Sequence, residues 1–138
     1  MARVNTYLNF MGNTEEAFTL YQRAFGGELR GLMRFGDMPE GPGISEDDED
    51  KILHVELDIV GGHTLMATDM LASMGHDLRI GNNVSISLEV DSREEADELY
   101  AILSEGSSDG TGLSEMFWGY WGTCLDRFGI RWMFTVPQ

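Results

Sequence analysis

His54 and Glu56 stand two residues apart in a segment where apolar and polar residues alternate. In a β-strand, residues i and i+2 point to the same face, so these two side chains would lie side by side. An imidazole beside a carboxylate could act as a base with an orienting acid, or supply two ligands to a metal ion at an unusual site. A partly exposed polar strand face explains the pair as well, and we favour that simpler interpretation. No catalytic residue is assigned, and His54 and Glu56 remain the candidates.

The single cysteine, Cys124, cannot form an internal disulfide bond. A catalytic thiol would need a neighbouring base, and the three histidines all lie in the middle of the chain. We therefore expect Cys124 to be a small buried or half-buried apolar residue.

The chain of 138 residues has 24 Asp and Glu against 9 Lys and Arg, a formal net charge of −15. Such a surface repels nucleic acid and anionic membranes, so neither is an expected partner.

No apolar run approaches the roughly 20 residues of a membrane span, and no secretion signal precedes the first strand pattern, which predicts a cytoplasmic protein. Glu40 and the acidic run at residues 46–50 lack the ligand spacing of a calcium loop and predict a solvated loop.

The pattern Glu-Glu-Ala-x-x-Leu-Tyr occurs twice, at residues 15–21 and 94–100, each time after an alternating apolar stretch. Strand and helix therefore recur with nearly the same spacing, which indicates two similar halves. Both predicted helices are amphipathic and need a sheet to cover their apolar side.

The start of each helix carries capping residues. Asn13 or Thr14 is predicted to cap the first helix, and Ser92 with Glu95 fits a capping box for the second.

Alternating patterns also predict the strands. Gly61 and Gly62 predict a two-residue hairpin turn between two of them. The predicted strands cover residues 4–10, 29–35, 52–60 and 63–69 in the first half and 84–90, 112–118, 120–125 and 130–136 in the second.

Two half-domains of this size could hardly fold alone, so we expect a single domain over residues 1–138. Its first module would cover about residues 1–70 and its second about 84–138, with a connector at about 70–83.

The repeat, together with a set of short motifs, resembles the PhnB-like branch of the vicinal oxygen chelate superfamily, which includes glyoxalase I, extradiol dioxygenases and bleomycin-resistance proteins. The resemblance covers the whole chain and implies an α+β fold. Two βαβββ modules would form mixed sheets with helices on the convex side and a concave cleft. The motifs are Tyr7-Leu8-x-Phe10, Ala24-Phe25-Gly26-Gly27, His54-Val55-Glu56-Leu57, Leu65-Met66-Ala67-Thr68-Asp69, Glu115-Met116-Phe117-Trp118-Gly119 and Asp126-Arg127-Phe128-Gly129-Ile130-Arg131-Trp132.

The superfamily holds a divalent metal with His, Glu or Gln from four strands. At the matching positions this chain has Asn5, Met66, Ser85 and Met133, which are poor ligands for the metals concerned. We therefore expect no metal and no cofactor. Some members of the branch carry a methyltransferase label, but the chain lacks the Gly-rich loop of a doubly wound sheet that usually binds adenosylmethionine.

Strand alternation predicts which side chains face the cleft. Polar groups would come from Asn5, Tyr7, Ser85 and Ser87, and apolar walls from Tyr7, Met66 and Met133. Some of these groups could instead lie at a subunit interface or in solvent. Trp118 and Trp121 could line the mouth of the cleft, whereas Trp132 shares its parity with core residues.

Three functional hypotheses follow. The first is a PhnB-like protein that binds a small molecule in the cleft without a divalent metal. The second is a glyoxalase- or dioxygenase-type enzyme that uses a metal at atypical ligands, and the third is a protein that sequesters a drug. The superfamily often pairs chains or modules to complete a cleft, so the resemblance and the abundant Met and aromatic residues also predict a homodimer.

Overall fold

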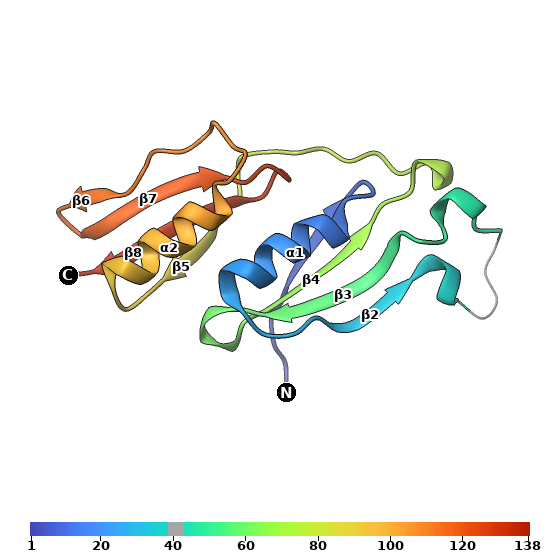
Figure 1. Cartoon of the computed structure of the whole chain (residues 1–138), viewed down its shortest axis with the longest axis horizontal. Coiled ribbons are helices and arrows are strands. Elements are labelled where there is room, and N and C mark those ends of the chain that lie inside the picture. Colours follow the sequence, from blue (N-terminus) through green and yellow to red (C-terminus); the bar gives the residue numbers. More distant parts are fainter. Residues whose placement is uncertain (39–42) are drawn as a thin grey trace. The chain divides into compact units, whose positions relative to one another are not determined.

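The protein is seen here as a computed structural model that describes residues 1–38 and 43–138. The chain divides into two compact units, unit 1 (Met1–Arg79) and unit 2 (Ile80–Gln138), and each is described by itself. Figure 1 shows that each unit contains one α-helix lying on a sheet. No helix among the described residues is long and apolar enough to span a membrane.

Unit 1 contains β1 (Thr6–Phe10), α1 (Thr14–Phe25), β2 (Arg30–Arg34), β3 (Ile52–Asp58) and β4 (Thr64–Asp69). The strands form a mixed sheet in the order β1-β4-β3-β2, in which β1 and β4 are parallel and the other pairs are antiparallel.

Unit 2 repeats this arrangement with β5 (Ile86–Glu89), α2 (Arg93–Leu103), β6 (Ser114–Met116), β7 (Gly119–Leu125) and β8 (Arg131–Pro137). Its sheet has the order β5-β8-β7-β6, with β5 and β8 parallel. The predicted α+β class with two βαβββ modules is therefore confirmed.

Each helix packs on the two strands at the middle of its sheet, α1 on β3 and β4 and α2 on β7 and β8. Alternate strand residues face the helix and are buried, including Leu8, Val55 and Leu65 in unit 1. Trp132 is completely buried in unit 2, as its parity predicted. Burial of each large apolar side chain contributes about 1.5–3 kcal/mol, so these two helix–sheet layers are the main source of stability.

The start of α1 is capped by a residue that is distant in sequence. The N-cap residue Asn13 makes no side-chain cap hydrogen bond. Instead, the buried carboxylate of Asp69 accepts hydrogen bonds from the Gly12 and Thr14 amides at 2.9 and 3.0 Å and from the Thr14 hydroxyl at 2.6 Å. Its second oxygen accepts from the Ile52 amide at 2.8 Å. Asn13 therefore occupies the N-cap position as predicted, but its side chain makes no cap hydrogen bond and a tertiary carboxylate takes the donors.

The start of α2 follows the local rule more closely. The Ser92 hydroxyl accepts a hydrogen bond from the Glu95 amide at 3.1 Å. In a full capping box, the Glu95 carboxylate would accept a hydrogen bond from the Ser92 amide. Here it accepts from the Asp91 amide instead, at 3.2 Å. The capping prediction is thus half confirmed.

The hairpin between β3 and β4 is one residue longer than predicted. The register pairs Asp58 with Thr64, and the Ile59 amide donates to the His63 carbonyl at 2.8 Å. Three residues, Val60 to Gly62, therefore form the turn, and Gly61 adopts a positive φ of 73° that favours glycine.

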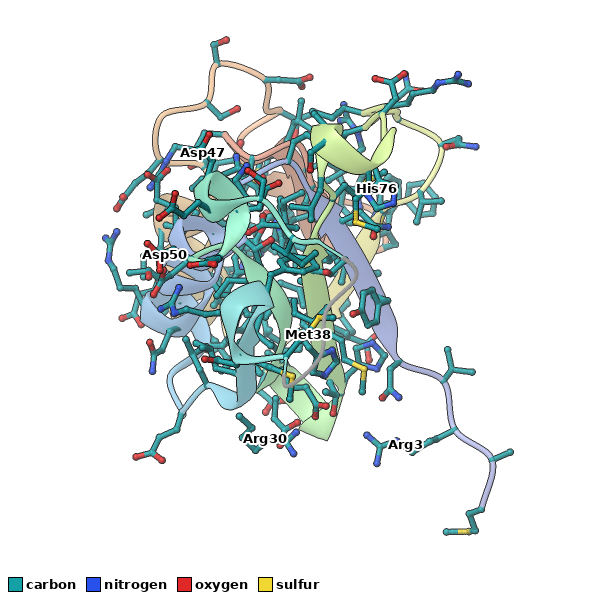
Figure 2. All side chains as sticks on the ribbon, turned by 90° about the vertical axis from the view of Figure 1, so that its right-hand side faces the viewer. Arg3, Arg30, Met38, Asp47, Asp50 and His76 are labelled. Atoms are coloured by element: carbon teal, nitrogen blue, oxygen red, sulfur yellow. The ribbon has the colours of Figure 1, made fainter. Side chains whose placement is uncertain are left out.

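The acidic run is only partly solvated. Ser45 caps a short 3-10 helix, Glu46–Asp48, and Asp48 is 5% exposed. The Asp48 carboxylate accepts hydrogen bonds from Lys51 and Ser73, both at 2.6 Å, so it anchors this segment to the unit. Glu40, which we also assigned to the loop, lies outside the described residues. Figure 2 shows Asp47 at the opposite end of unit 1 from Arg30.

Candidate functional site

The face of the unit 1 sheet opposite α1, which we call the open face, brings several predicted site residues together. Tyr7 of β1 pairs with Met66 of β4, and Met66 pairs in turn with Glu56 of β3. These three residues therefore form one row across neighbouring strands. His54 lies two residues before Glu56 on the same face, as the alternation predicted.

Hydrogen bonds join three side chains of this face into what we call the Tyr7–His54–Glu56 chain. The Tyr7 hydroxyl lies 3.1 Å from His54 Nδ1, and His54 Nε2 lies 2.8 Å from a Glu56 carboxylate oxygen. A neutral imidazole protonated on Nε2 satisfies both contacts: it donates to Glu56 and accepts from Tyr7. Both ring nitrogens are thus engaged, and the lone pair of a would-be base is already occupied.

The surroundings keep the phenol protonated. Partial burial is the main reason that the pKa of Tyr7 is raised. A hydrogen bond with Thr68 lowers it in part, and the Glu56 carboxylate adds a smaller rise. The Tyr7 side chain is still 47% exposed, so its oxygen can contact a ligand. Met33 pairs with His54 in the neighbouring strand and is also exposed. The open face therefore combines ordered polar groups with thioether side chains.

Beyond Glu56, charged side chains continue the polar network to the end of the sheet. Arg30 Nη1 lies 3.5 Å from Glu56, and Arg30 Nη2 donates to Asp58 at 2.6 Å. The Thr64 hydroxyl also donates to Asp58 at 2.8 Å. Mainly through this Thr64 hydrogen bond, and also through Arg30, the pKa of Asp58 is lowered, so its carboxylate is charged at neutral pH.

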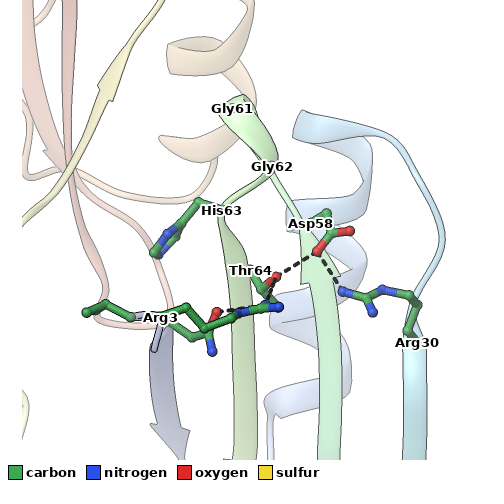
Figure 3. Close-up of a pocket in the computed structure, with 9 residues that line it drawn as sticks. Arg3, Arg30, Asp58, Gly61, Gly62, His63 and Thr64 are labelled. Carbon is green, nitrogen blue, oxygen red and sulfur yellow. Dashed lines mark hydrogen bonds and ion pairs between the residues drawn. The ribbon is translucent and has the colours of Figure 1, made fainter. Parts of the chain in front are cut away.

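A pocket of about 460 Å³ opens at this end of unit 1, and Figure 3 shows it between Arg3 and Arg30. Asn5, a predicted ligand-binding residue, belongs to its lining. The pocket is lined by Arg3, Val4, Asn5, Arg30, Asp58, Gly61, Gly62, His63 and Thr64.

Sequence reasoning missed most of this pocket. His63 was not among the predicted site residues, yet it lines the pocket, is half-buried, and has its Nε2 2.8 Å from the Thr6 hydroxyl. Neither the spacing of Arg3 and Arg30 nor any motif around them indicated a binding site in the sequence. Their one signal is rarity, because Lys and Arg together number 9 in the whole chain.

The remaining predicted site residues lie in unit 2. Ser87 pairs with Met133 across β5 and β8, whereas Ser85 lies outside β5, contrary to the predicted strand. Trp118 and Trp121 are in contact, with ring centroids 5.7 Å apart, and Phe117 stacks edge-on against Trp118. Unit 2 thus carries an aromatic cluster rather than a hydrogen-bonded polar chain.

The Asp126 motif has a structural role. The Asp126 carboxylate accepts hydrogen bonds from the Phe128 and Ile130 amides at 2.9 and 3.0 Å and from the buried Trp132 indole at 2.9 Å. It fixes the β7–β8 turn onto the core of unit 2, much as Asp69 ties α1 to β3 and β4.

A family comparison agrees with this arrangement. The family described as 3-demethylubiquinone-9 3-methyltransferase has a sequence model that matches residues 2–135. The chain belongs to this family. The predicted resemblance to PhnB-like proteins is thereby confirmed.

Solved structures support the same conclusion. The protein PA1353 from Pseudomonas aeruginosa is 38% identical with a TM-score of 0.87, covering 100% of this chain and 99% of that one. A PhnB protein from Bacillus cereus has the same fold at 23% identity and a TM-score of 0.77, covering 99% and 100% of the two chains. A glyoxylase/bleomycin resistance protein/dioxygenase domain from Frankia sp. EAN1pec shares the fold at 12% identity and a TM-score of 0.64, covering 100% and 97%.

The family's name implies a methyl donor, and the loop after β1 does not fit one. In nucleotide-type sites, free backbone amides at a helix start bind the ligand. Here the Gly12 and Thr14 amides already donate to Asp69. Membership of the 3-demethylubiquinone-9 3-methyltransferase family therefore does not by itself supply a methyl-transfer site in this loop.

The superfamily's metal site does not fit the donor set either. Asn5 lies in a polar pocket, Met66 offers a thioether, and Ser85 lies outside its strand. Among the described residues, no group of three or more His, Cys, Asp or Glu side chains is placed to hold a metal ion. His54 and Glu56 bind each other instead, and we derive no chemical step through a metal.

Proposed function

We propose that this protein binds a small molecule on the open face of unit 1, around the Tyr7–His54–Glu56 chain, without a divalent metal. The hydrogen-bonded chain itself is the observation that carries the proposal. The hydrogen bonds among these three side chains hold them in place on a partly exposed strand face. A surface ordered in advance loses less conformational entropy when it binds a ligand.

The chemistry of the face favours binding over proton abstraction. The imidazole has both nitrogens engaged, and the raised pKa of Tyr7 keeps its phenol from acting as a phenolate base at neutral pH. What the face offers is a phenol oxygen, an imidazole and a carboxylate beside the thioethers of Met33 and Met66. Such a mixture of a few polar groups with soft apolar walls suits a small polar or aromatic ligand.

The test uses protein with ¹³C-labelled methionine methyl groups, titrated with phenol, benzamide and indole as probes. At least one probe is expected to shift the Met33 and Met66 methyl signals saturably. Met74, which is exposed in a short 3-10 helix of unit 1, is the internal control and should not move. Tyr7→Phe and His54→Ala should each weaken binding about tenfold, as the loss of a hydrogen-bonded group predicts.

Ser87→Ala is the matched variant in unit 2 and should leave the affinity unchanged. The proposal is wrong if none of the probes moves Met33 or Met66 more than Met74. It is also wrong if chelator-treated protein loses binding, zinc or manganese restores it, and His54→Ala abolishes the restoration. That result would establish the metal-dependent hypothesis instead.

A further inference from the structure

Two guanidinium groups meet at the pocket between Arg3 and Arg30, on a chain that is acidic as a whole. The formal net charge is −15, yet two of the nine Lys and Arg residues line this one pocket. Among the described residues of the lining, Asp58 alone carries a carboxylate. Figure 2 shows Arg3 and Arg30 towards one end of unit 1 and Asp47 of the acidic run towards the other. The described lining therefore holds two guanidinium groups against one carboxylate on an acidic protein, and Glu56 is a further partner of Arg30.

The two arginines reach the pocket from separate segments. Figure 3 shows their side chains on either side of Thr64 and Asp58. Arg30 is held by Asp58 at 2.6 Å, while Arg3 Nη2 donates to Asn5 and Thr64 at 3.1 and 3.2 Å. Two neutral side chains thus hold the Arg3 guanidinium, which makes no ion pair among the described residues but helps to lower the pKa of Asp58 through its charge.

Donors remain for a ligand. In the part of the chain that the structure describes, Arg3 makes two side-chain hydrogen bonds, and Nη2 is the donor in both. The N–H groups of Nε and Nη1 can therefore donate to a ligand. The His63 ring is engaged through Nε2 with Thr6, and its Nδ1 is a further donor in the tautomer in which the Thr6 hydroxyl donates to Nε2. Gly61 and Gly62 have no Cβ and keep the backbone at this edge of the pocket accessible.

We infer that this pocket is a binding site for a small oxyanion, namely a carboxylate or phosphate group carried by a small molecule. A guanidinium presents parallel N–H donors that match two oxygens of either group. A volume of about 460 Å³ accommodates a whole small molecule. This site goes beyond the proposed function, which concerns the neighbouring Tyr7–His54–Glu56 chain. Arg30 contacts both Glu56 and Asp58 and so connects the two.

The experiment is an amide NMR titration of the full chain with sodium phosphate and, separately, sodium acetate at constant ionic strength. Saturable shifts are expected at Asn5, Gly61, Gly62 and His63 with at least one anion. The anion that binds more tightly identifies the group as phosphate or carboxylate. Arg3→Gln is expected to weaken that binding about tenfold, equivalent to one lost charged contact.

Two further variants keep the test specific. Arg79→Gln removes the same charge from a side chain that is 90% exposed and, among the described residues, forms an ion pair with Asp77 alone. It should leave the affinity unchanged. Asp58→Asn removes the carboxylate found among the described lining residues, and it should tighten anion binding because Arg30 loses the closer of its two counter-ions and keeps only Glu56.

The inference is overturned if neither anion gives saturable shifts at the pocket amides. It is equally overturned if Arg79→Gln weakens binding as much as Arg3→Gln, because the effect would then be one of net charge. These readouts differ from the Met33 and Met66 signals, so this inference and the proposed function can fail separately.

Discussion

Units 1 and 2 share the register of three strands, β1-β4-β3 in one and β5-β8-β7 in the other, but carry different side chains at matching places on the sheet face opposite the helix. In unit 1, Met66 lies between Tyr7 and Glu56. In unit 2, Met133 lies at the same point of the pattern, between Ser87 and Thr123. Glu56 thus matches Thr123, and the residues two positions before them are His54 in unit 1 and Trp121 in unit 2.

Both units have a methionine at this point, but the ionisable side chains differ. Ser87 takes the place of Tyr7, Trp121 that of His54 and Thr123 that of Glu56. The repeat therefore determines the strands and helix of both units, but it does not place the same polar side chains in both. The polar chemistry of this protein is concentrated in unit 1.

The two helices show a second contrast. Both begin with Glu-Glu-Ala, yet α2 is capped by Ser92 next to it in sequence, whereas α1 is capped by Asp69, which is 55 residues from Thr14. Similar local sequences are thus completed by a local side chain in one unit and by a tertiary contact in the other.

The largest expected effect comes from removing the tertiary cap. Asp69→Ala leaves the Gly12, Thr14 and Ile52 donors without their acceptor at a site that is 3% exposed. We expect the free energy of unfolding to fall by about 3–5 kcal/mol, measured by urea denaturation. Ser92→Ala, which removes the local cap, should cost only about 1 kcal/mol.

Exposed Asp47→Ala serves as the control and should leave stability nearly unchanged. Equal losses for Asp69→Ala and Ser92→Ala would show that the two caps are energetically alike and would remove the contrast.

A smaller effect is expected where one unit has a glycine and the other a side chain. Gly122 of β7 matches Val55 of β3 in the register. A Cβ at Gly122 would collide with the Gly112 carbonyl and lie 2.7 Å from Leu113, because the chain before β6 packs there. We expect Gly122→Ala to destabilise the protein by about 1–3 kcal/mol in urea denaturation.

Gly81→Ala provides the matched control, because its Cβ would meet nothing closer than 3.6 Å and its φ is not positive. It should be neutral or slightly stabilising. A neutral Gly122→Ala would mean that the close approach at residues 112–113 does not distinguish the units.

The smallest effect concerns the thiol. Cys124 of β7 takes the register position of Leu57 in β3, and both side chains are fully buried. Burial, with smaller contributions from Asp126 and Asp109, raises the pKa of Cys124 to about 12. At pH 8 the folded protein should therefore show almost no reaction with a disulfide reagent and react fully in urea, because only the thiolate attacks.

Leu57→Cys in a Cys124→Ser background should be protected to the same degree, since the two positions are equivalent. If native Cys124 reacted as fast as the unfolded chain, its assignment as an inert core residue would be wrong.

Much of the frame was predictable because periodicity is a local property. The repeat predicted both helices, and alternation predicted the shared face of His54 and Glu56 and the burial of Trp132. The ends of strands were less predictable: Ser85 fell outside β5, and the β3–β4 turn gained a residue through its register. The site was predictable only in part, since Tyr7, His54, Glu56 and Met66 were candidates while Arg3, Arg30 and His63 were not.

By itself, the sequence determined that strand and helix recur twice and which side chains of each strand are buried, because apolar burial follows a short period along the chain. The tertiary structure alone decided which polar groups meet. Tyr7 and His54 are 47 residues apart, and Arg3 and Thr64 are 61 apart. Their contacts depend on sheet pairing and on the direction of long side chains, neither of which leaves a periodic trace in the sequence.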